Sequence, residues 1–283
     1  MTKELTGRVP MTCTDLAASA RPCPPPATGW GLAAARTIIA LILREMSTRY
    51  GRTPGGYIWA ILEPMGTILI LAAGFSMLVR APALGHSFLL FYATGYLPFA
   101  LYQGVALTVA RALTFSRPLL LYPAVTWADA LIARFVLNAL TGVMVACLIL
   151  AAILALSDTR SVLEIGPILT AFALAAGVGL GMGTLNCLLT GLFPAWEVIW
   201  SILTRPLFLA SGALFLFESV PRAVQAVLWF NPLLHIAGIM RAGFYPMYHP
   251  GYVSVIYVVV FALSTLALGL VLLHRYHKDI LTI

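Results

Sequence analysis

The stretch IGPILTAFALAAGVGLGMGTLNCLLTGLFPAW, residues 165–196, contains no charged side chain. It is 32 residues long, whereas about 20 apolar residues are enough for a helix to cross the hydrocarbon core of a bilayer. Across the 283 residues of the chain, 61% are hydrophobic and 10% are charged. A soluble domain carries about 25% charged residues. The sequence therefore predicts an all-α membrane protein whose main solvent is lipid.

Six stretches are long and apolar enough to be transmembrane helices. Besides residues 165–196, the stretches 88–110, 135–156 and 250–273 carry no charge. Two more are apolar apart from one charged residue each, which is Glu63 in the first and Arg205 in the second. The expected spans are residues 57–79, 88–110, 128–156, 165–192, 198–217 and 252–273, all within one transmembrane domain at residues 31–283.

The positions of lysine and arginine predict how these spans are oriented, because short cytoplasmic loops collect basic residues. With the N-terminus in the cytoplasm, eleven basic residues fall in cytoplasmic segments and four in external ones. Both termini are therefore expected in the cytoplasm, and residues 1–30 are expected to form a disordered cytosolic tail. This bias, together with attraction to anionic lipid, explains the formal charge of +7. No nucleic-acid-binding module is recognisable.

Residues 32–50 predict an amphipathic helix that lies in the membrane interface. Apolar residues recur there at helical spacing, with Arg36, Arg44, Arg49 and Glu45 around them. Charges are costly inside hydrocarbon, which favours an interfacial helix over the alternative of a short first span. The following sequence GRTPGG indicates a sharp turn before the first expected span.

Two segments outside the spans also carry a prediction. LTFSRPLLLYPAVTW, residues 113–127, has an apolar centre between two prolines, which indicates a short cytoplasmic helix that docks on a partner. An interfacial or re-entrant piece of the bundle is the alternative. Residues 218–251 are rich in aromatic residues and interrupted by prolines. They predict a periplasmic re-entrant helical hairpin between spans five and six, which lines or caps a passage.

Motifs for energy conversion and catalysis are missing from the sequence. A phosphate-binding loop needs a lysine directly after a glycine, and neither Lys3 nor Lys278, the only lysines, follows one. If ATP drives this protein, a separate subunit must bind it. Glu63 is the only acid well inside a span, which disfavours proton- or sodium-coupled transport. No catalytic or metal site is expected, although a membrane-embedded glycosyl- or acyltransferase remains the alternative from a different class.

Two stretches resemble a known family. LREMSTRYGRTPGGYIWAILEPMG, residues 43–66, is similar to the N-terminal signature of ABC-2 type permeases, where an arginine-bearing interfacial helix precedes the first span. The matching positions are Gly56, Trp59, Ala60 and Pro64. Residues 205–245 are similar to the fifth span and periplasmic hairpin of the branch that exports capsular polysaccharide. That likeness is carried by Pro206, Ser211, Gly212, Pro221, Asn231, Pro232, His235 and Arg241.

The resemblance, which covers about residues 32–280, implies a function and a set of partners. The implied protein is a homodimeric permease in the bacterial inner membrane, joined to two cytosolic nucleotide-binding ATPase subunits. It moves lipid-linked capsular polysaccharide outward and binds no cofactor, since ATP and magnesium belong to the ATPase. An inner-membrane co-polymerase and an outer-membrane channel are further implied partners. O-antigen or teichoic-acid export is the alternative within the same architecture.

The resemblance also implies sites. Spans one and five would line the passage, and aromatic side chains there would stack on sugar rings while Arg205 attracts acidic sugars. An ion pair of Arg205 with Glu63 or Glu197, or snorkelling to an interface, is the alternative. The conduit candidates are Tyr57, Trp59, Phe75, Trp200, Arg205, Phe208, Phe215 and Phe217. The candidates for ATPase coupling are Arg117, Leu119, Leu120 and Leu121, and those for the phosphate of the lipid anchor are Arg44, Arg49 and Arg52.

Overall fold

The computed structural model describes residues 30–50, 56–120, 125–156 and 163–282. The chain divides into two compact units, Met1–Ala35 and Arg36–Ile283. Of the first unit only the beginning of one helix is described, and the expected cytosolic tail lies almost wholly outside the described residues. Apart from the beginning of that helix, all the elements and sites described below belong to the second unit.

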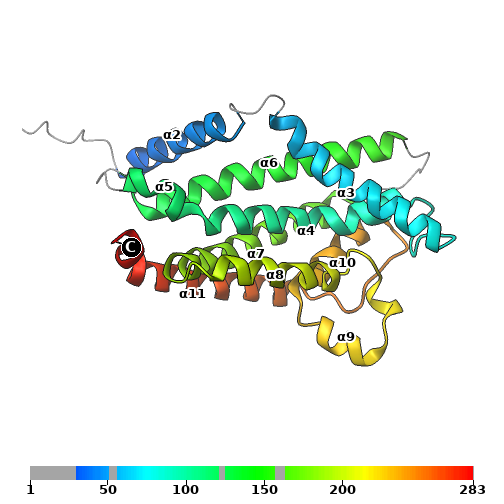
Figure 1. Cartoon of the computed structure of the whole chain (residues 1–283). Coiled ribbons are helices and arrows are strands. Elements are labelled where there is room, and N and C mark those ends of the chain that lie inside the picture. The colour runs from blue at the N-terminus through cyan, green and yellow to red at the C-terminus, as the bar shows by residue number, and fades with distance from the viewer. Residues whose placement is uncertain (1–29, 51–55, 121–124, 157–162, 283) are drawn as a thin grey trace, which may run out of the picture. The chain divides into compact units, whose positions relative to one another are not determined.

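Within the described ranges, every regular element is a helix. The elements are α2 (Trp30–Tyr50), α3 (Gly56–Leu78), α4 (Phe88–Ala110), α5 (Ala112–Leu120), α6 (Trp127–Leu156), α7 (Ile165–Leu192), α8 (Trp196–Ala210), η1 (Phe217–Ser219), α9 (Arg222–Leu228), α10 (Pro232–Phe244) and α11 (Val255–Thr282). Helices α4, α6, α7, α8 and α11 run lengthwise beside one another (Figure 1). One end of this bundle carries α5 and the last turn of α11, and the other carries α9; we call them the α5 end and the α9 end.

Four of the described helices are long and apolar enough to cross a membrane by themselves, and they include most of α3, α6, α7 and α11. A fifth is added if α9 and α10, which meet at an angle of 101°, are taken as one broken span. Neither α4 nor α8 is among them. Helix α8 has only 15 residues, and α4 interrupts its apolar sequence with polar residues such as Gln103. The described structure therefore holds four to five apolar spans, fewer than the six expected.

Two helices end at residues that differ from the expected span boundaries. The fifth span was expected to reach residue 217, but α8 ends at Ala210. The chain turns there because Ser211 caps the helix and Gly212 has a φ of +72°, a left-handed conformation that suits glycine. The sixth span was expected to end at residue 273, whereas α11 continues to Thr282.

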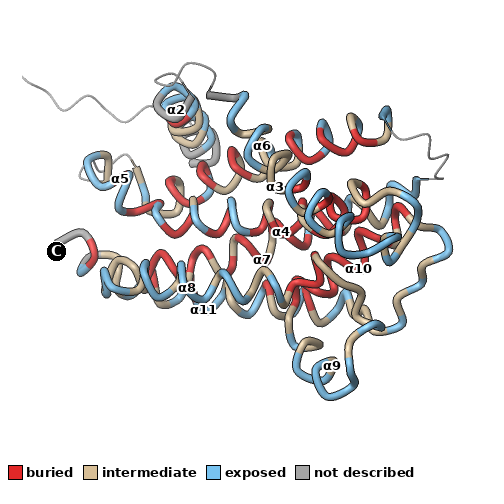
Figure 2. Tube along the Cα trace, turned by 45° about the vertical axis from the view of Figure 1, so that its right-hand side comes forward, coloured by how far each residue is buried: buried red, intermediate tan, exposed pale blue. Residues whose placement is uncertain are grey.

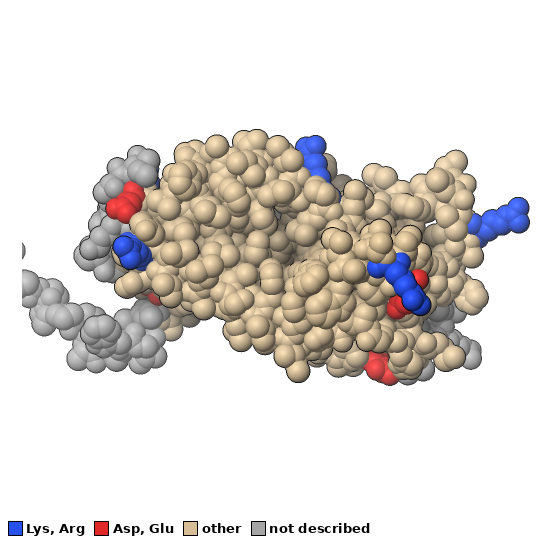
Figure 3. All heavy atoms as spheres, turned by 90° about the horizontal axis from the view of Figure 1, so that it is seen from below, with Lys and Arg blue, Asp and Glu red and all other residues tan. Residues whose placement is uncertain are grey.

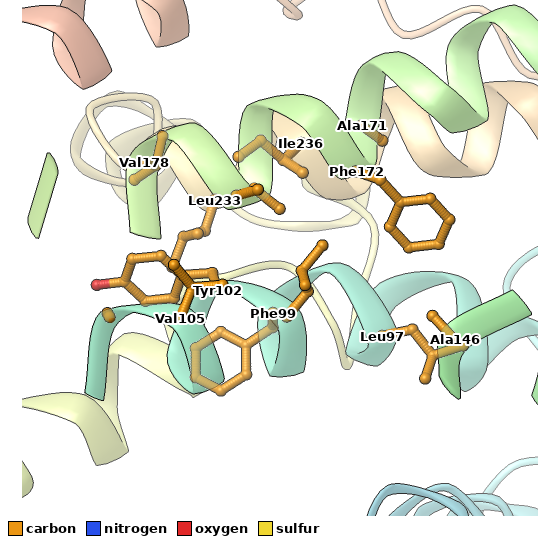
Figure 4. Close-up of a cluster of buried hydrophobic side chains, with 14 of the residues drawn as sticks. Leu97, Phe99, Tyr102, Val105, Ala146, Ala171, Phe172, Val178, Leu233 and Ile236 are labelled. Carbon is orange, nitrogen blue, oxygen red and sulfur yellow. The ribbon is translucent and has the colours of Figure 1, made fainter. Parts of the chain in front are cut away.

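The core of the bundle lies between α4, α7 and α10, which carry most of the buried residues in Figure 2. Tyr102 of α4 points toward Leu233 of α10, whereas the ring of Phe99 lies on the other side of α4, toward α8 (Figure 4). Such interdigitated packing of buried side chains is what holds helices together in an apolar solvent.

Glycines at every second position of α7 allow this helix to pack on both sides. A Cβ at Gly183 would lie 2.8 Å from the Cβ of Val109 in α4. A Cβ at Gly181 would lie 2.8 Å from the carbonyl oxygen of Ala262 in α11. The glycine repeat therefore serves close approach between helices, as small residues do in membrane proteins.

Charged residues are sparse on the surface. Figure 3 shows a face on which uncharged side chains cover a broad continuous area and only a few charged side chains stand out. Many large apolar side chains are exposed on α3, α8 and α11. A surface of this kind is suited to lipid or to another protein rather than to water.

Candidate functional site

A cavity of about 880 Å³ lies between α4 and α8 and is completed by residues of α3 and α7. We call it the α4–α8 pocket. It is lined by Thr67, Tyr96, Phe99, Tyr102, Gln103, Ala106, Leu107, Ala110, Arg111, Asn186, Thr190, Glu197, Val198, Trp200, Ser201, Thr204, Arg205, Phe208 and Leu209. Its volume lies in the range typical of ligand sites.

Aromatic rings form part of the wall of this pocket. Phe208 of α8 packs against Phe99 and Tyr96 of α4, with ring centroids 5.1 Å and 6.0 Å apart. Trp200 lies two helical turns before Phe208 on the same face of α8, and it stacks on Trp196 with centroids 6.4 Å apart. The pocket therefore offers ring faces and edges along much of α8.

Uncharged polar groups lie between these rings. Thr67, Gln103, Thr190, Ser201 and Thr204 contribute hydroxyl and amide groups. The Thr204 and Ser201 hydroxyls donate to carbonyl oxygens of their own helix, at 2.8 Å and 2.7 Å. Each hydroxyl oxygen therefore keeps acceptor capacity for a ligand.

Asn186 stands out among the polar residues of the pocket. Its Oδ1 accepts a hydrogen bond of 2.9 Å from Nε1 of Trp196, which fixes the first turn of α8 against α7. Its buried Nδ2 has no hydrogen-bond partner in the described part of the chain. A buried donor without a partner is costly, so a water or ligand in the pocket is the natural acceptor.

An ion pair lies at the α5 end of the pocket. Arg111 caps the C-terminus of α4 and pairs with Glu197 in the first turn of α8. Both side chains are about half exposed, at 54% and 48%, so the pair contributes little to stability. Because Arg111 directly precedes α5, the pair connects that short helix to the mouth of the pocket.

Arg205 lies in the wall of the pocket and is exposed. The two ion pairs among the described residues do not include it, and Glu197 is engaged by Arg111. Glu63 lines a different cavity. In the described structure Arg205 therefore lines a cavity and is not paired with an acid.

The other conduit candidates lie elsewhere. Phe75 packs on Tyr92 with ring centroids 5.2 Å apart, and Phe217 packs on Tyr252 at 4.3 Å. Trp59 is exposed on α3 outside the pocket. Phe215 is half-buried beside the buried Arg241, and the side chain of Tyr57 is outside the described residues. The pocket thus brings together Trp200, Arg205 and Phe208 of the predicted set.

Arg241 holds the loop that follows α8. Its guanidinium, 1% exposed, donates to the carbonyl oxygens of Phe215 and Ala213 at 2.9 Å and 3.1 Å. It also lies 4.3 Å above the ring of Phe91. Asn231 adds a 2.9 Å hydrogen bond to the carbonyl oxygen of Ala210. These contacts hold the end of α8 and the loop after it against α4 and α10.

A second polar centre joins the helices at the α5 end. Arg134 of α6 forms a buried ion pair of 3.1 Å with Glu45 of α2 and donates to the carbonyl oxygen of Thr108 in α4 at 3.0 Å. Its guanidinium lies 4.2 Å from the ring centroid of Phe115 in α5. The Arg134 side chain therefore contacts three other helices, α2, α4 and α5.

The candidates for coupling and for the lipid anchor lie partly in this region. Arg117 is exposed on α5, and Leu119 and Leu120 are half-buried. Arg44 lies 5.8 Å from the ring of Phe115. Leu121, Arg52 and the side chain of Arg49 are outside the described residues.

Known proteins are similar in sequence to this chain over most of its length. The ABC-2 type transporter family matches residues 36–245. The polysialic acid transport protein KpsM of Escherichia coli is 30% identical over 246 residues, which cover 87% of this chain and 95% of that protein.

Two further relatives are named as capsule polysaccharide export inner-membrane proteins. They are CtrC of Neisseria meningitidis serogroup B and BexB of Haemophilus influenzae. Each is 27% identical over 247 residues, covering 87% of this chain and 92% of the relative. The family match spans well over half of the chain, and the chain therefore belongs to the ABC-2 type transporter family.

Proposed function

We propose that this chain is the permease subunit of an ATP-driven exporter that moves lipid-linked capsular polysaccharide across the bacterial inner membrane. Relatives that cover nearly the whole chain carry names of polysaccharide transport and export proteins. The proposal includes six spans, with α4 and α8 as the second and fifth, and both termini in the cytoplasm.

The observation that carries the proposal is the chemistry of the α4–α8 pocket. Aromatic faces bind the C–H faces of sugars without requiring one fixed register. A polymer that slides through a passage cannot have a fixed register. Hydroxyl groups and the free Nδ2 of Asn186 offer exchangeable hydrogen bonds to sugar hydroxyls. Arg205 adds a positive charge that attracts acidic sugars.

A second copy of the chain is expected to complete the pocket. None of the residues of α8 is buried, and its exposed side chains include Arg205 as well as Ile202 and Leu203. A cation that faces lipid is costly. A partner copy packed along α3 and α8 would cover the apolar side chains and leave Arg205 in a watery passage.

Energy would enter through α5. This helix of nine residues exposes Arg117 and lies in the short connection between α4 and α6, where an ATPase subunit would contact it. Arg111, directly before α5, connects this helix to the pocket through Glu197. Arg134 of α6 connects it to α2 and α4. A shift of α5 would therefore reach the mouth of the pocket. A co-polymerase and an outer-membrane channel would receive the polymer.

The proposal is tested in cells that make a capsular polymer and its ATPase but lack their own permease. Trp200→Ala and Phe208→Ala are expected to lower surface polymer about tenfold each, because one aromatic stacking contact is worth on the order of 1 kcal/mol or more. Trp200→Phe keeps a ring and is expected to retain most of the export. Immunodetection of polymer outside and inside the cells measures the effect. Unchanged export in both alanine variants would contradict a role for this pocket.

A further inference from the structure

A second cavity, of about 310 Å³, lies between α3, α4 and α6. We call it the Glu63 pocket, after the carboxylate in its wall. It shares Tyr96, Gln103 and Leu107 of α4 with the α4–α8 pocket but is otherwise bounded by different residues. The function proposed above does not use it.

The lining of the Glu63 pocket changes from polar to apolar along its length. Thr108 and Asn138 lie at the α5 end, where the Thr108 hydroxyl donates to Oδ1 of Asn138 at 3.2 Å. Gln103 and Thr141 follow one turn further along the antiparallel helices α4 and α6. The far end is made of Leu97, Leu101, Val145 and Ala146. Figure 4 shows Leu97 and Ala146 beside each other at this apolar end.

Glu63 lies within one of the apolar spans, which covers residues 58–78. The two ion pairs of the described residues use Glu45 and Glu197 instead, and no described side chain donates a hydrogen bond to the Glu63 carboxylate. An ionised carboxylate in a span is costly unless a cation or a polar cavity compensates for it. A cation bound beside the exposed Glu63 carboxylate would offset this cost.

Depth and shape indicate where that cation comes from. Glu63 is seven residues after the first residue of α3, or about 10 Å along the helix. With α3 entering the bilayer from the cytoplasm, as in the proposed function, Glu63 lies in the cytoplasmic half of the span. A polar end at that depth and an apolar end deeper in the membrane match an amphiphile.

We propose that the Glu63 pocket binds a phospholipid with a primary ammonium headgroup from the cytoplasmic leaflet. The ammonium group has three N–H donors, and Glu63, Gln103 and Thr141 supply acceptor oxygens around the pocket. The acyl region follows Leu97, Leu101 and Val145. A choline headgroup has no N–H to donate, and an anionic headgroup is repelled by Glu63.

Native mass spectrometry of the purified permease with an equimolar mixture of phosphatidylethanolamine and phosphatidylcholine tests this first. About fivefold enrichment of the ethanolamine lipid is expected, a preference of about 1 kcal/mol. The N,N-dimethyl derivative is expected to fall in between. Equal retention of the two lipids by the unaltered protein would overturn the proposal.

Two variants locate the site. Glu63→Gln is expected to abolish the preference, and Val145→Trp is expected to abolish it by filling the apolar end while leaving the carboxylate in place. Glu164→Gln is the matched control, because Glu164 is an exposed acid that lines none of the three cavities described. An unchanged preference in Glu63→Gln would overturn the assignment. Since polymer export is measured separately, failure here leaves the proposed function standing.

Discussion

Single residues determine how closely the helices approach around the loop after α8. A Cβ at Gly95 of α4 would lie 2.8 Å from the Cα and carbonyl oxygen of Ala213 and 3.0 Å from Nη2 of Arg241. Backbone atoms cannot move away as easily as the end of a flexible side chain, so the space for this contact exists only because position 95 has no side chain.

Gly95→Ala is therefore expected to destabilise the protein by about 1–3 kcal/mol, the usual cost of overpacking. Gly74→Ala is the matched control, since nothing lies within 4 Å of a Cβ there, and alanine at an open helical position is expected to be neutral or stabilising by up to about 1 kcal/mol. Thermal unfolding in detergent compares the two variants. Equal midpoints would contradict the close contact between α4 and the loop.

The buried ion pair of Arg134 and Glu45 gives a second prediction at this scale. Their side chains are only 7% and 10% exposed, so Glu45→Gln leaves the arginine charge buried without its acid. Breaking such a pair is expected to cost about 3–5 kcal/mol, whereas replacing both members by apolar residues is much less harmful. The double variant Glu45→Leu with Arg134→Met should thus unfold at a higher temperature than Glu45→Gln. The reverse order would contradict the account.

The limits of sequence-based prediction are clearest for these residues. Trp200, Arg205 and Phe208 were predicted as conduit residues and do line one cavity, because they share a helix and its periodicity. Phe75 and Phe217 pack against tyrosines instead, which a pattern within one span does not reveal. The pairs of Glu45 with Arg134 and of Arg111 with Glu197 join residues far apart in the sequence.

Two residues of the pocket were missed but left a signal. Gln103 and Asn186 are the only side-chain amides in the apolar stretches 88–110 and 165–196. An amide inside a span needs a polar partner, so each is a reasonable candidate for a cavity-lining residue. Which cavity they would share depends on how the helices pack, and the sequence of one chain does not contain that information directly.

Among the elements, α4 and α5 are joined with almost no loop, since α4 ends at Ala110 and α5 begins at Ala112. The residue between them is Arg111, whose partner Glu197 opens α8. A movement of α5 would therefore be transmitted to the start of α8 through this ion pair. The half-exposed pair is weak enough to open and close during a transport cycle.

Reversing either charge tests this connection. Arg111→Glu and Glu197→Arg are each expected to lower export severalfold while shifting stability by less than about 1 kcal/mol. The double variant restores the attraction and should recover export. Surface polymer and thermal unfolding are measured on the same variants. If the double variant exports as little polymer as each single variant, the ion pair itself has no role in export.

The short helix α5 also predicts where the ATPase binds. Leu119→Ser with Leu120→Ser is expected to lose copurification of the nucleotide-binding subunit, because it removes apolar surface at the end of α5. Leu163→Ser is the control, as this leucine is exposed at the opposite end of the bundle. Retention of the ATPase by the double variant would argue that α5 is not its docking site.

For the whole molecule, the sequence predicted the helical class, because long uncharged stretches leave few alternatives. The boundary of α8 was not predicted, since the turn depends on Ser211 and Gly212 and on the contacts of Arg241 with the loop. The exposed face of α8 is likewise a property of the assembled bundle. That face is where the proposed second copy would lie.

The most direct test of the account is whether the polymer touches the α4–α8 pocket during export. A photoreactive benzoylphenylalanine at position 208 replaces an aromatic residue of the pocket wall, and the same group at Leu268 on the exposed face of α11 is the control. In cells that synthesise the polymer, illumination should cross-link polysaccharide to position 208 and not to position 268, and only when the ATPase is active. Absence of cross-linked polymer at position 208, or equal cross-linking at both positions, would contradict a passage through this pocket.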